Sequence, residues 1–537
     1  MKYLTKEINL SDKIVLLMGL GLNGGGLGAA LYLAPKVKKL IITDLKSQQE
    51  LLPSLERLKN FNNIEYHLNG HYLDDFLKAD IILKGAGIKY SNQYIKAAIE
   101  NDKIIDTDIG YFFELANFPI IGITGSKGKS TTTTLIYQIL SSEIEKVILG
   151  GNIAISPLIQ IEEKKDAKLA VLELSSWQLS DLAVHRKSPD IAVLTTIFPD
   201  HLNFYNSMEE YYEDKKNIFK YQDKDNYAVI NVCNEYLYKS IINNEIKSNI
   251  IFVANLDEYS PDKYTDKNIL QKLNSLLSKE FCFFTIKYKD NIFLLKNKNF
   301  NFNYSLNQYF INNNDEYPEY NNILKKINIE ISIKQDKQID KDKFDLFVLP
   351  SISKVKLKGE HNFTNILLSI STAIISGIKI ENIYNTIQSF EGPEFRLQTV
   401  REFNGITFIN DTTATVPDAV AASILALKNK GRIILIAGGV DKKLPVDKMA
   451  ECIAENVYKL YLLEGSGSDI LKNRLLSYGF NSFEDGFKDL KKLVEYAYKN
   501  AEENDIILLS PGFASFNLFI NEFDRGKIFN QAVSSLK

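Results

Sequence analysis

The sequence predicts an α/β protein of three domains, each built around a mostly parallel, doubly wound sheet. Two observations support this class. The chain has 537 residues, and a prior of about 150 residues per domain gives roughly three domains. Short apolar runs that end in glycine or a polar residue alternate with longer helix-like stretches, as in parallel strands joined by crossover helices. Ligands bind such sheets at the carboxyl ends of the strands.

The first domain is expected over residues 1–117 and is predicted to be Rossmann-like. Its stretch KIVLLMGLGLNGGGLGAALYLAPKVKKLIITDLK contains an apolar run, a glycine turn, a helix-like segment and a second apolar run that ends at Asp44. Gly19, Gly21 and Gly24 fit the G-x-G-x-x-G fingerprint, with an acid about 20 residues downstream. A dinucleotide-binding dehydrogenase is therefore one interpretation of this turn taken alone.

The second domain is expected over residues 118–396 and opens with PIIGITGSKGKSTTTTL. Gly125 and Gly128 allow backbone N–H groups to face phosphate, Lys129 can reach the β and γ phosphates, and Ser130 can bind Mg²⁺. Ile123 stands where the usual G-x-x-x-x-G-K-[ST] pattern has its first glycine. We call residues 124–130 the phosphate loop, and it predicts a P-loop type of mononucleotide-binding domain.

Two further regions complete the predicted organisation. Residues 255–348 are rich in Asn, Lys, Asp and Tyr, and we interpret them as an insertion without a catalytic part. A third, Rossmann-like domain is expected over residues 397–537, where ITFINDTTATVPDA, RIILIAGGVDKKL, KLYLLEGSG and DIILLSPGFASF repeat the pattern of strand and loop.

Composition narrows the class of function. A formal charge of −3 gives no general attraction to nucleic acid or to an anionic membrane. The three cysteines are far apart and form no CxxC pair, which favours a reducing compartment. The amino end has no signal-peptide core, and no apolar run approaches the roughly 18 residues of a membrane span. We expect a cytoplasmic monomer that binds small molecules and neither nucleic acid nor a lipid bilayer.

Chemistry-bearing side chains follow several predicted elements. Glu173 ends the run LAVLEL, and His201 follows the run that ends in TTIFPD. Ser207 and Glu210 form an S-x-x-E capping pattern, so a helix should begin with Met208. Helical periodicity places Lys215 in the middle of the apolar face of this helix and Lys216 at its rim. Burial favours the neutral amine of lysine, which is the form that adds CO₂.

Several motifs together resemble the Mur ligases, and within them the branch that adds D-glutamate. The resemblance covers nearly the whole chain outside residues 255–348, and its shortened loop TGxxGK[ST] is the form found in that family. The motifs that carry it are GITGSKGKSTTT, GGNIA, LELSSWQL, PDHLNFYNSMEEYYEDKKNIF, LKGEHNFTNIL, GPEFRLQTV, NDTTATVPDA, GGVDKK and LLSPGFASFNLFINEFDRG.

The resemblance implies ATP-dependent amide formation in peptidoglycan synthesis. ATP phosphorylates the carboxylate of UDP-N-acetylmuramoyl-L-alanine, and the amine of D-glutamate attacks the acyl phosphate, releasing ADP and phosphate. Two Mg²⁺ ions are implied, held by Ser130, Glu173, His201 and a carbamylated Lys215. The implied catalytic residues are Lys129, Glu173, His201 and Lys215.

The resemblance also implies three sets of binding residues. The set for ATP is Gly125, Ser126, Lys127, Gly128, Lys129, Ser130, Thr131, Asn362, Asn365, Arg396 and Asp411. The set for the UDP substrate is Leu22, Asn23, Asp44, Asn152, Ser175 and His201, with Gln178 supporting that wall. The set for glutamate is Thr415, Lys442, Ser515, Phe516 and Phe523. Thr413 stands where some relatives have lysine, and Lys443 where many have glycine.

Two alternatives remain at this point. Another amino-acid-adding ligase, such as a folylpolyglutamate synthetase or a later Mur enzyme, would share the phosphate loop but differ in the first domain or in the carboxyl-terminal pocket. A non-catalytic nucleotide-binding regulator is a second alternative, although Lys129, Glu173, His201 and Lys215 argue against it.

Overall fold

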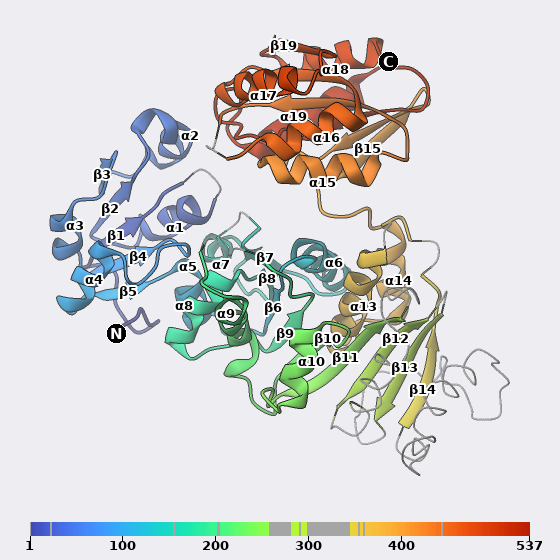
Figure 1. Ribbon diagram of the computed structural model, residues 1–537. Coiled ribbons are helices and arrows are strands. Elements are labelled where there is room, and N and C mark those ends of the chain that lie inside the picture. Colours follow the sequence, from blue (N-terminus) through green and yellow to red (C-terminus); the bar gives the residue numbers. More distant parts are fainter. Residues whose placement is uncertain are drawn as a thin grey trace. The chain divides into compact units, whose positions relative to one another are not determined.

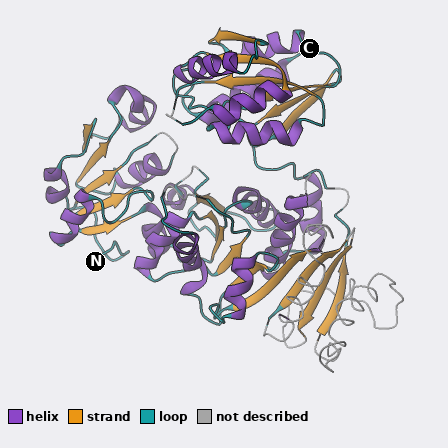
Figure 2. Cartoon of the chain, in the orientation of Figure 1, coloured by secondary structure: helices purple, strands orange, loops and turns teal. Residues whose placement is uncertain are grey.

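The computed structural model describes residues 2–21, 24–153, 156–200, 204–256, 276, 281–288, 291–297, 344–352, 355–357, 360–441 and 444–537. Across these residues the chain forms three β-sheets with helices packed against them (Figures 1 and 2). It divides into two compact units, Met1–Phe390 and Glu391–Lys537. The first unit holds two of the sheets and the second unit holds the third. The predicted α/β class is therefore confirmed.

The first sheet has five parallel strands in the order β3-β2-β1-β4-β5. Gly26 permits the close turn after β1, because a Cβ atom there would overlap the carbonyl oxygens of Gly19 and Leu20. The elements are β1 (Ile14–Met18), α1 (Gly25–Leu33), β2 (Lys39–Asp44), α2 (Gln48–Leu58), β3 (Ile64–Leu68), α3 (Leu73–Lys78), β4 (Ile81–Lys84), α4 (Gln93–Glu100), β5 (Ile104–Asp106) and α5 (Asp108–Leu115).

The second sheet has nine strands in the order β14-β13-β12-β11-β10-β9-β6-β8-β7. The strands from β7 to β12 are parallel, and their near-continuous apolar sequences match burial on both faces. The elements are β6 (Ile120–Thr124), α6 (Lys129–Ser141), β7 (Val147–Gly151), α7 (Pro157–Glu163), β8 (Leu169–Glu173), α8 (Ser176–His185), β9 (Ile191–Leu194), α9 (Met208–Lys220), β10 (Tyr227–Asn231), α10 (Glu235–Ile242), β11 (Asn249–Asn255), β12 (Phe283–Tyr288), β13 (Asn291–Asn297), β14 (Phe344–Leu349), α13 (Glu360–Ile375) and α14 (Ile380–Ser389).

The stretch interpreted as an insertion, residues 255–348, contains part of this sheet. β12 pairs in parallel with β11, and β13 and β14 continue the sheet as antiparallel strands. Phe283 and Leu294 are fully buried, and Thr285 Oγ1 lies 2.9 Å from Ser371 Oγ on α13. β12 and β13 are therefore part of the core of the first unit.

The second unit contains a six-stranded sheet in the order β15-β16-β20-β17-β18-β19. Only the edge pair β15 and β16 is antiparallel among the strand pairs described in this unit. The elements are β15 (Gln398–Phe403), β16 (Ile406–Asn410), α15 (Pro417–Leu427), β17 (Arg432–Gly438), α16 (Asp447–Asn456), β18 (Val457–Leu463), α17 (Ser466–Ser477), β19 (Phe483–Phe487), α18 (Leu490–Lys499), β20 (Asp505–Leu509) and α19 (Glu522–Ser535). Among the helices that the structure describes, none combines the length and the apolar character needed to cross a bilayer.

Residues 298–343 connect two strands that are already neighbours, because Asn297 of β13 pairs with Phe344 of β14. A two-residue Asn-Gly turn can join such an antiparallel pair. We expect replacement of residues 298–343 by Asn-Gly to raise the thermal unfolding midpoint by a few degrees at most, since each halving of loop length lowers the closure cost by only about 0.6 kcal/mol. Removal of residues 281–297 should instead abolish folding. A loss of more than about 5 °C in the first variant would contradict this prediction.

Candidate functional site

The phosphate loop joins β6 to the amino end of α6. Neighbouring atoms leave no room for a side chain at either of its two glycines. Gly128 is the residue before the helix and has a left-handed backbone, φ +86°. A Cβ atom on Gly128 would overlap Asn365 Oδ1, and one on Gly125 would overlap Thr195 Oγ1. Unpaired N–H groups and the helix dipole make the amino end of such a helix an anion site. The loop therefore has the geometry that the sequence predicts for phosphate binding, and Ser130 and Thr131 lie in the first turn of α6.

Ser126 anchors the loop to the segment after β9. Its N–H donates to Thr196 O at 2.6 Å, while its hydroxyl donates to Phe198 O at 2.8 Å and accepts from Phe198 N at 2.9 Å. Thr195 Oγ1 donates to Lys127 O at 2.6 Å, which fixes the next residue of the loop. Ser126 was predicted as an ATP-binding residue, and in the structure its N–H and hydroxyl are occupied by bonds within the protein.

Two lysines converge on a single carbonyl of the loop. Lys129 Nζ donates to Gly125 O at 2.9 Å and to Ser126 O at 3.1 Å. Lys215 Nζ donates to the same Gly125 O at 3.0 Å and to Thr124 Oγ1 at 3.2 Å. Lys215 is 1% exposed. Burial lowers the pKa of its ammonium well below the usual range, and the neighbouring charge of Lys129 lowers it further.

The helix that carries Lys215 begins where the sequence predicts. α9 starts at Met208, and its N-cap Ser207 accepts from Glu210 N at 3.2 Å. The carboxylate of Glu210 bonds to Asn206 N, at 2.9 Å, instead of closing a reciprocal capping box. Lys216 lies toward the edge of the packed face and forms ion pairs with Glu213 and Glu245.

Glu173 presents a buried carboxylate at the end of β8, in register with Ile123 of β6. It is 2% exposed, and its Oε1 accepts from Asn152 Nδ2 at 2.9 Å. Its Oε2 is buried and has no hydrogen-bond partner within the described residues. A bound cation would satisfy such an oxygen, so this donor fits a divalent metal ion.

His201, predicted to bind metal and UDP substrate, lies outside the described residues. No three His, Cys, Asp or Glu side chains of the described part form a metal-binding group by themselves.

On the substrate side, two predicted residues take part in local structure. Asp44 Oδ2 accepts from Leu20 N at 2.9 Å and from Gly21 N at 3.1 Å, so it holds the glycine turn. Ser175 is the N-cap of α8 and forms a capping box with Gln178. The S-x-x-Q spacing in SSWQ could have revealed this box. Leu22 and Asn23 lie outside the described residues.

Asn365 on α13 reaches the phosphate loop across a long sequence separation. Its Oδ1 accepts from Thr132 Oγ1 at 3.3 Å, and its Nδ2 donates to Asn362 Oδ1 at 3.1 Å. The structure thus brings the two asparagines predicted to lie near adenine beside the helix that follows the loop.

In the second unit, Arg396 lies in an unusual backbone segment. Phe395 and Leu397 on either side of it have left-handed backbones, with φ +65° and +44°. Leu397 N donates to Asp411 Oδ1 at 3.1 Å, and Thr413 Oγ1 donates to Phe395 O at 2.9 Å. Burial raises the pKa of Asp411. Such backbone strain persists only where the surroundings hold it, and it is common at functional sites.

The residues predicted for glutamate lie on loops of the second unit. Ser515 is buried, Phe516 is exposed, and the Phe523 ring lies 6.2 Å from that of Phe395. Arg525, fully buried on α19, donates to Thr412 Oγ1 at 2.9 Å and to Thr412 O at 3.0 Å. Arg525 therefore fixes the loop that leads to Thr415. Lys442 and Lys443 lie outside the described residues.

The fold and the site define a three-sheet α/β protein with a phosphate loop, and comparisons with known proteins identify its family. The model of the Mur ligase middle domain matches residues 123–299, and that of the Mur ligase glutamate ligase domain matches residues 395–513. The UDP-N-acetylmuramoylalanine–D-glutamate ligase of Borreliella afzelii is 31% identical over 97% of each chain. Its counterpart in Roseiflexus sp. is 30% identical over 98% of this chain and 100% of the relative.

Among solved structures, the UDP-N-acetylmuramate-alanine ligase of Thermotoga maritima aligns with a TM-score of 0.53. The alignment covers 98% of this chain and all of that chain at 15% identity, so it concerns the fold alone. Sequence and fold agree, and the chain belongs to the Mur ligase family.

The anchoring role of Ser126 can be measured directly. We expect Ser126→Ala to lower the free energy of unfolding of the first unit by about 1–2 kcal/mol, because both backbone groups of Phe198 lose their partner. Urea unfolding followed by the fluorescence of Trp177, the single tryptophan of the chain, measures this change. Ser389→Ala is the control, since that hydroxyl is exposed and bonds within its own helix. Equal stabilities of the two variants would contradict the anchoring role.

Proposed function

We propose that this chain is an ATP-dependent ligase that adds D-glutamate to UDP-N-acetylmuramoyl-L-alanine in peptidoglycan synthesis, releasing ADP and phosphate. The observation that carries the substrate assignment is the similarity of about 30% over nearly the whole chain to D-glutamate ligases of this substrate. The geometry of the phosphate loop, with two lysines on one carbonyl beside a buried carboxylate, supports the phosphoryl chemistry.

The reaction couples two bond exchanges. A carboxylate oxygen of the alanyl group attacks the γ-phosphorus of ATP, and the bond from that phosphorus to ADP breaks. The amine of D-glutamate then attacks the carbonyl carbon, phosphate leaves, and the amine loses a proton. Lys129 supplies positive charge where negative charge moves between oxygens, and such positioned electrostatics typically contribute several kcal/mol.

Mg²⁺ fits the oxygen donors of this site. We assign Glu173 and Ser130 to one ion, and His201 and the carbamate of Lys215 to a second. Bound Mg²⁺ neutralises the charge of the phosphate oxygens and aligns them. The buried Glu173 Oε2, which has no partner within the described residues, is the structural support for this assignment.

The surroundings of Lys215 support the proposal that it is carbamylated. Lys129 and Lys215 share Gly125 O, so two charged ammonium groups there would repel each other. The neutral amine of Lys215 can attack CO₂, form an N–C bond and lose a proton, which leaves an anionic carbamate. That anion relieves the repulsion and offers oxygen donors that suit Mg²⁺.

The remaining assignments follow the family pattern. The UDP substrate contacts Leu22, Asn23, Asn152, Ser175 and the region of Asp44. The adenine side of ATP contacts Asn362 and Asn365, with Arg396 and Asp411 as further ATP contacts. Glutamate contacts Thr415, Lys442, Ser515, Phe516 and Phe523, where a cation and a hydroxyl can hold its carboxylates.

The substrate assignment is tested by phosphate release with ATP, UDP-N-acetylmuramoyl-L-alanine and a panel of amino acids that includes L-glutamate. We expect stimulation by D-glutamate alone and a stoichiometric amide product in the mass spectrum. Stimulation by another amino acid, with none by D-glutamate, would show that the substrate is wrongly assigned.

Lys215 and Lys216 form a matched pair for the carbamate proposal. We expect Lys215→Ala to lose about 10³-fold in kcat, because an anionic group at the phosphoryl-transfer site is lost. A short carboxylic acid should restore part of that activity. Lys216→Ala, which removes the side chain that pairs with Glu213 and Glu245, should stay within about twofold of wild type.

A ¹³C carbamate signal from labelled bicarbonate should appear in wild type and vanish in Lys215→Ala. Absence of that signal from active wild-type enzyme would refute the modification.

A further inference from the structure

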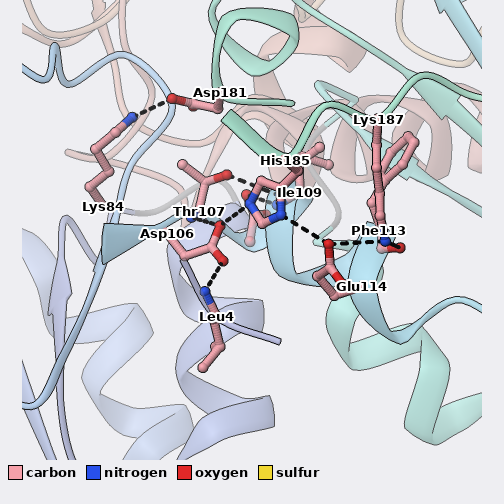
Figure 3. A network of polar contacts seen from close by, with 12 residues as sticks. Leu4, Lys84, Asp106, Thr107, Ile109, Phe113, Glu114, Asp181, His185 and Lys187 are labelled. Atoms are coloured by element: carbon pink, nitrogen blue, oxygen red, sulfur yellow. Dashed lines mark hydrogen bonds and ion pairs between the residues drawn. The ribbon is translucent and has the colours of Figure 1, made fainter. Parts of the chain in front are cut away.

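A buried charged network joins the first sheet to helix α8 (Figure 3). His185, the last residue of α8, has a side chain that is 2% exposed. Its Nε2 lies 2.9 Å from Asp106 Oδ1, at the end of β5, and its Nδ1 lies 3.1 Å from Glu114 Oε1 on α5. The network thus links residues that are more than seventy positions apart.

The partners of His185 favour its charged form. An ionised carboxylate only accepts hydrogen bonds, so a carboxylate at each ring nitrogen favours the doubly protonated imidazolium form. Burial opposes this charge, but Asp106 and Glu114 outweigh it, and the pKa of His185 is raised. Asp106 also accepts from Thr107 N at 2.7 Å and from Leu4 N at 2.9 Å. The ion pair is therefore embedded in a rigid set of backbone donors.

A glycine inside α5 makes room for this contact. A Cβ atom on Gly110 would overlap Asp106 Oδ1 and would lie 2.5 Å from His185 Nε2. Glycine in a helix interior costs stability relative to alanine. The close approach of histidine and carboxylate explains why glycine is tolerated at this position.

A second buried pair holds the same helix four residues earlier. Lys84, the last residue of β4, lies 2.6 Å from Asp181 Oδ1 through its Nζ, and both side chains are at most 4% exposed. Asp181 and His185 are spaced by four, so they lie on one face of α8. The other end of α8 begins at Ser176, three residues after Glu173. Helix α8 therefore links the ends of β4 and β5 to the segment that carries Glu173.

We propose that Lys84, Asp106, Glu114, Asp181 and His185, which we call the latch, are positioning residues that hold the first sheet in register with Glu173 and the phosphate loop. This role rests on the proposed function, in which the first sheet binds the UDP substrate. The reacting carboxylate and the γ-phosphate must approach to about 3–3.5 Å, and small displacements cost large factors in rate. Paired charges fix direction as well as distance, which an apolar contact between the same elements would not do.

The chain offers a matched control for a test of the latch. His67 also lies between two carboxylates, with Nδ1 2.5 Å from Asp75 Oδ2 and Nε2 2.9 Å from Glu65 Oε1, but all three belong to β3 and α3. We expect His185→Gln to lower kcat/KM for the UDP substrate at least tenfold and to leave the KM for ATP within twofold. His67→Gln should leave both values unchanged. Glu114→Gln, which keeps an oxygen acceptor and removes one charge, is a milder second variant expected to act in the same direction.

Hydrogen exchange of the ligand-free enzyme provides a readout that needs no turnover. We expect His185→Gln and Glu114→Gln to speed exchange in α5 and in the second half of α8 by at least tenfold, and His67→Gln to leave both segments unchanged. Unchanged exchange in both latch variants would overturn the latch itself. Faster exchange with equal losses toward ATP and the UDP substrate, or with no loss, would overturn the positioning role. Wild-type enzyme that ligates no amino acid to the UDP substrate would overturn the proposed function, and the exchange result would still decide whether the latch exists.

Discussion

The carbonyl of Gly125 is the point on which the rest of the site depends. It accepts from both Lys129 and Lys215, so the loop between β6 and α6 carries two amines at one acceptor in a buried setting. Two full positive charges there would repel each other with little water to screen them. The site therefore favours either a neutral lysine or an added anion, and both the buried Glu173 and a phosphate group supply negative charge.

The segment after β9 and helix α13 hold this loop in place. Thr195 after β9 and Asn365 on α13 lie so close to Gly125 and Gly128 that no side chain fits there, and Ser126 bonds to the backbone of Phe198. The strand order β9-β6-β8 places the segment after β9 beside the loop, at the carboxyl ends of the strands. Neighbouring side chains, as well as the backbone angles, therefore require glycine at these two positions. The conformation of the loop depends on the parts of the central domain that supply those neighbours.

Local features of the fold could be predicted from the sequence, and long-range contacts could not. Alternating apolar runs and glycine turns predicted the α/β class, and a capping pattern predicted that α9 begins at Met208. The partners of Ser126 and His185 are about seventy to eighty residues away, where no local pattern signals them. Residues 255–348 are rich in Asn and Lys, and this composition is not typical of core strands. Short apolar runs within them, such as FCFFTI, nevertheless contribute to the core strands β12 and β13.

Thr413 has a structural role in the second unit. Thr413 stands where some relatives have lysine, and its hydroxyl donates to the carbonyl of Phe395. That carbonyl belongs to the segment in which Phe395 and Leu397 adopt left-handed backbones around Arg396. Left-handed backbones at residues with side chains are unfavourable unless other contacts hold them. Thr413 on one side and Asp411 on the other supply such contacts, so the loop that follows β16 fixes the backbone on both sides of Arg396.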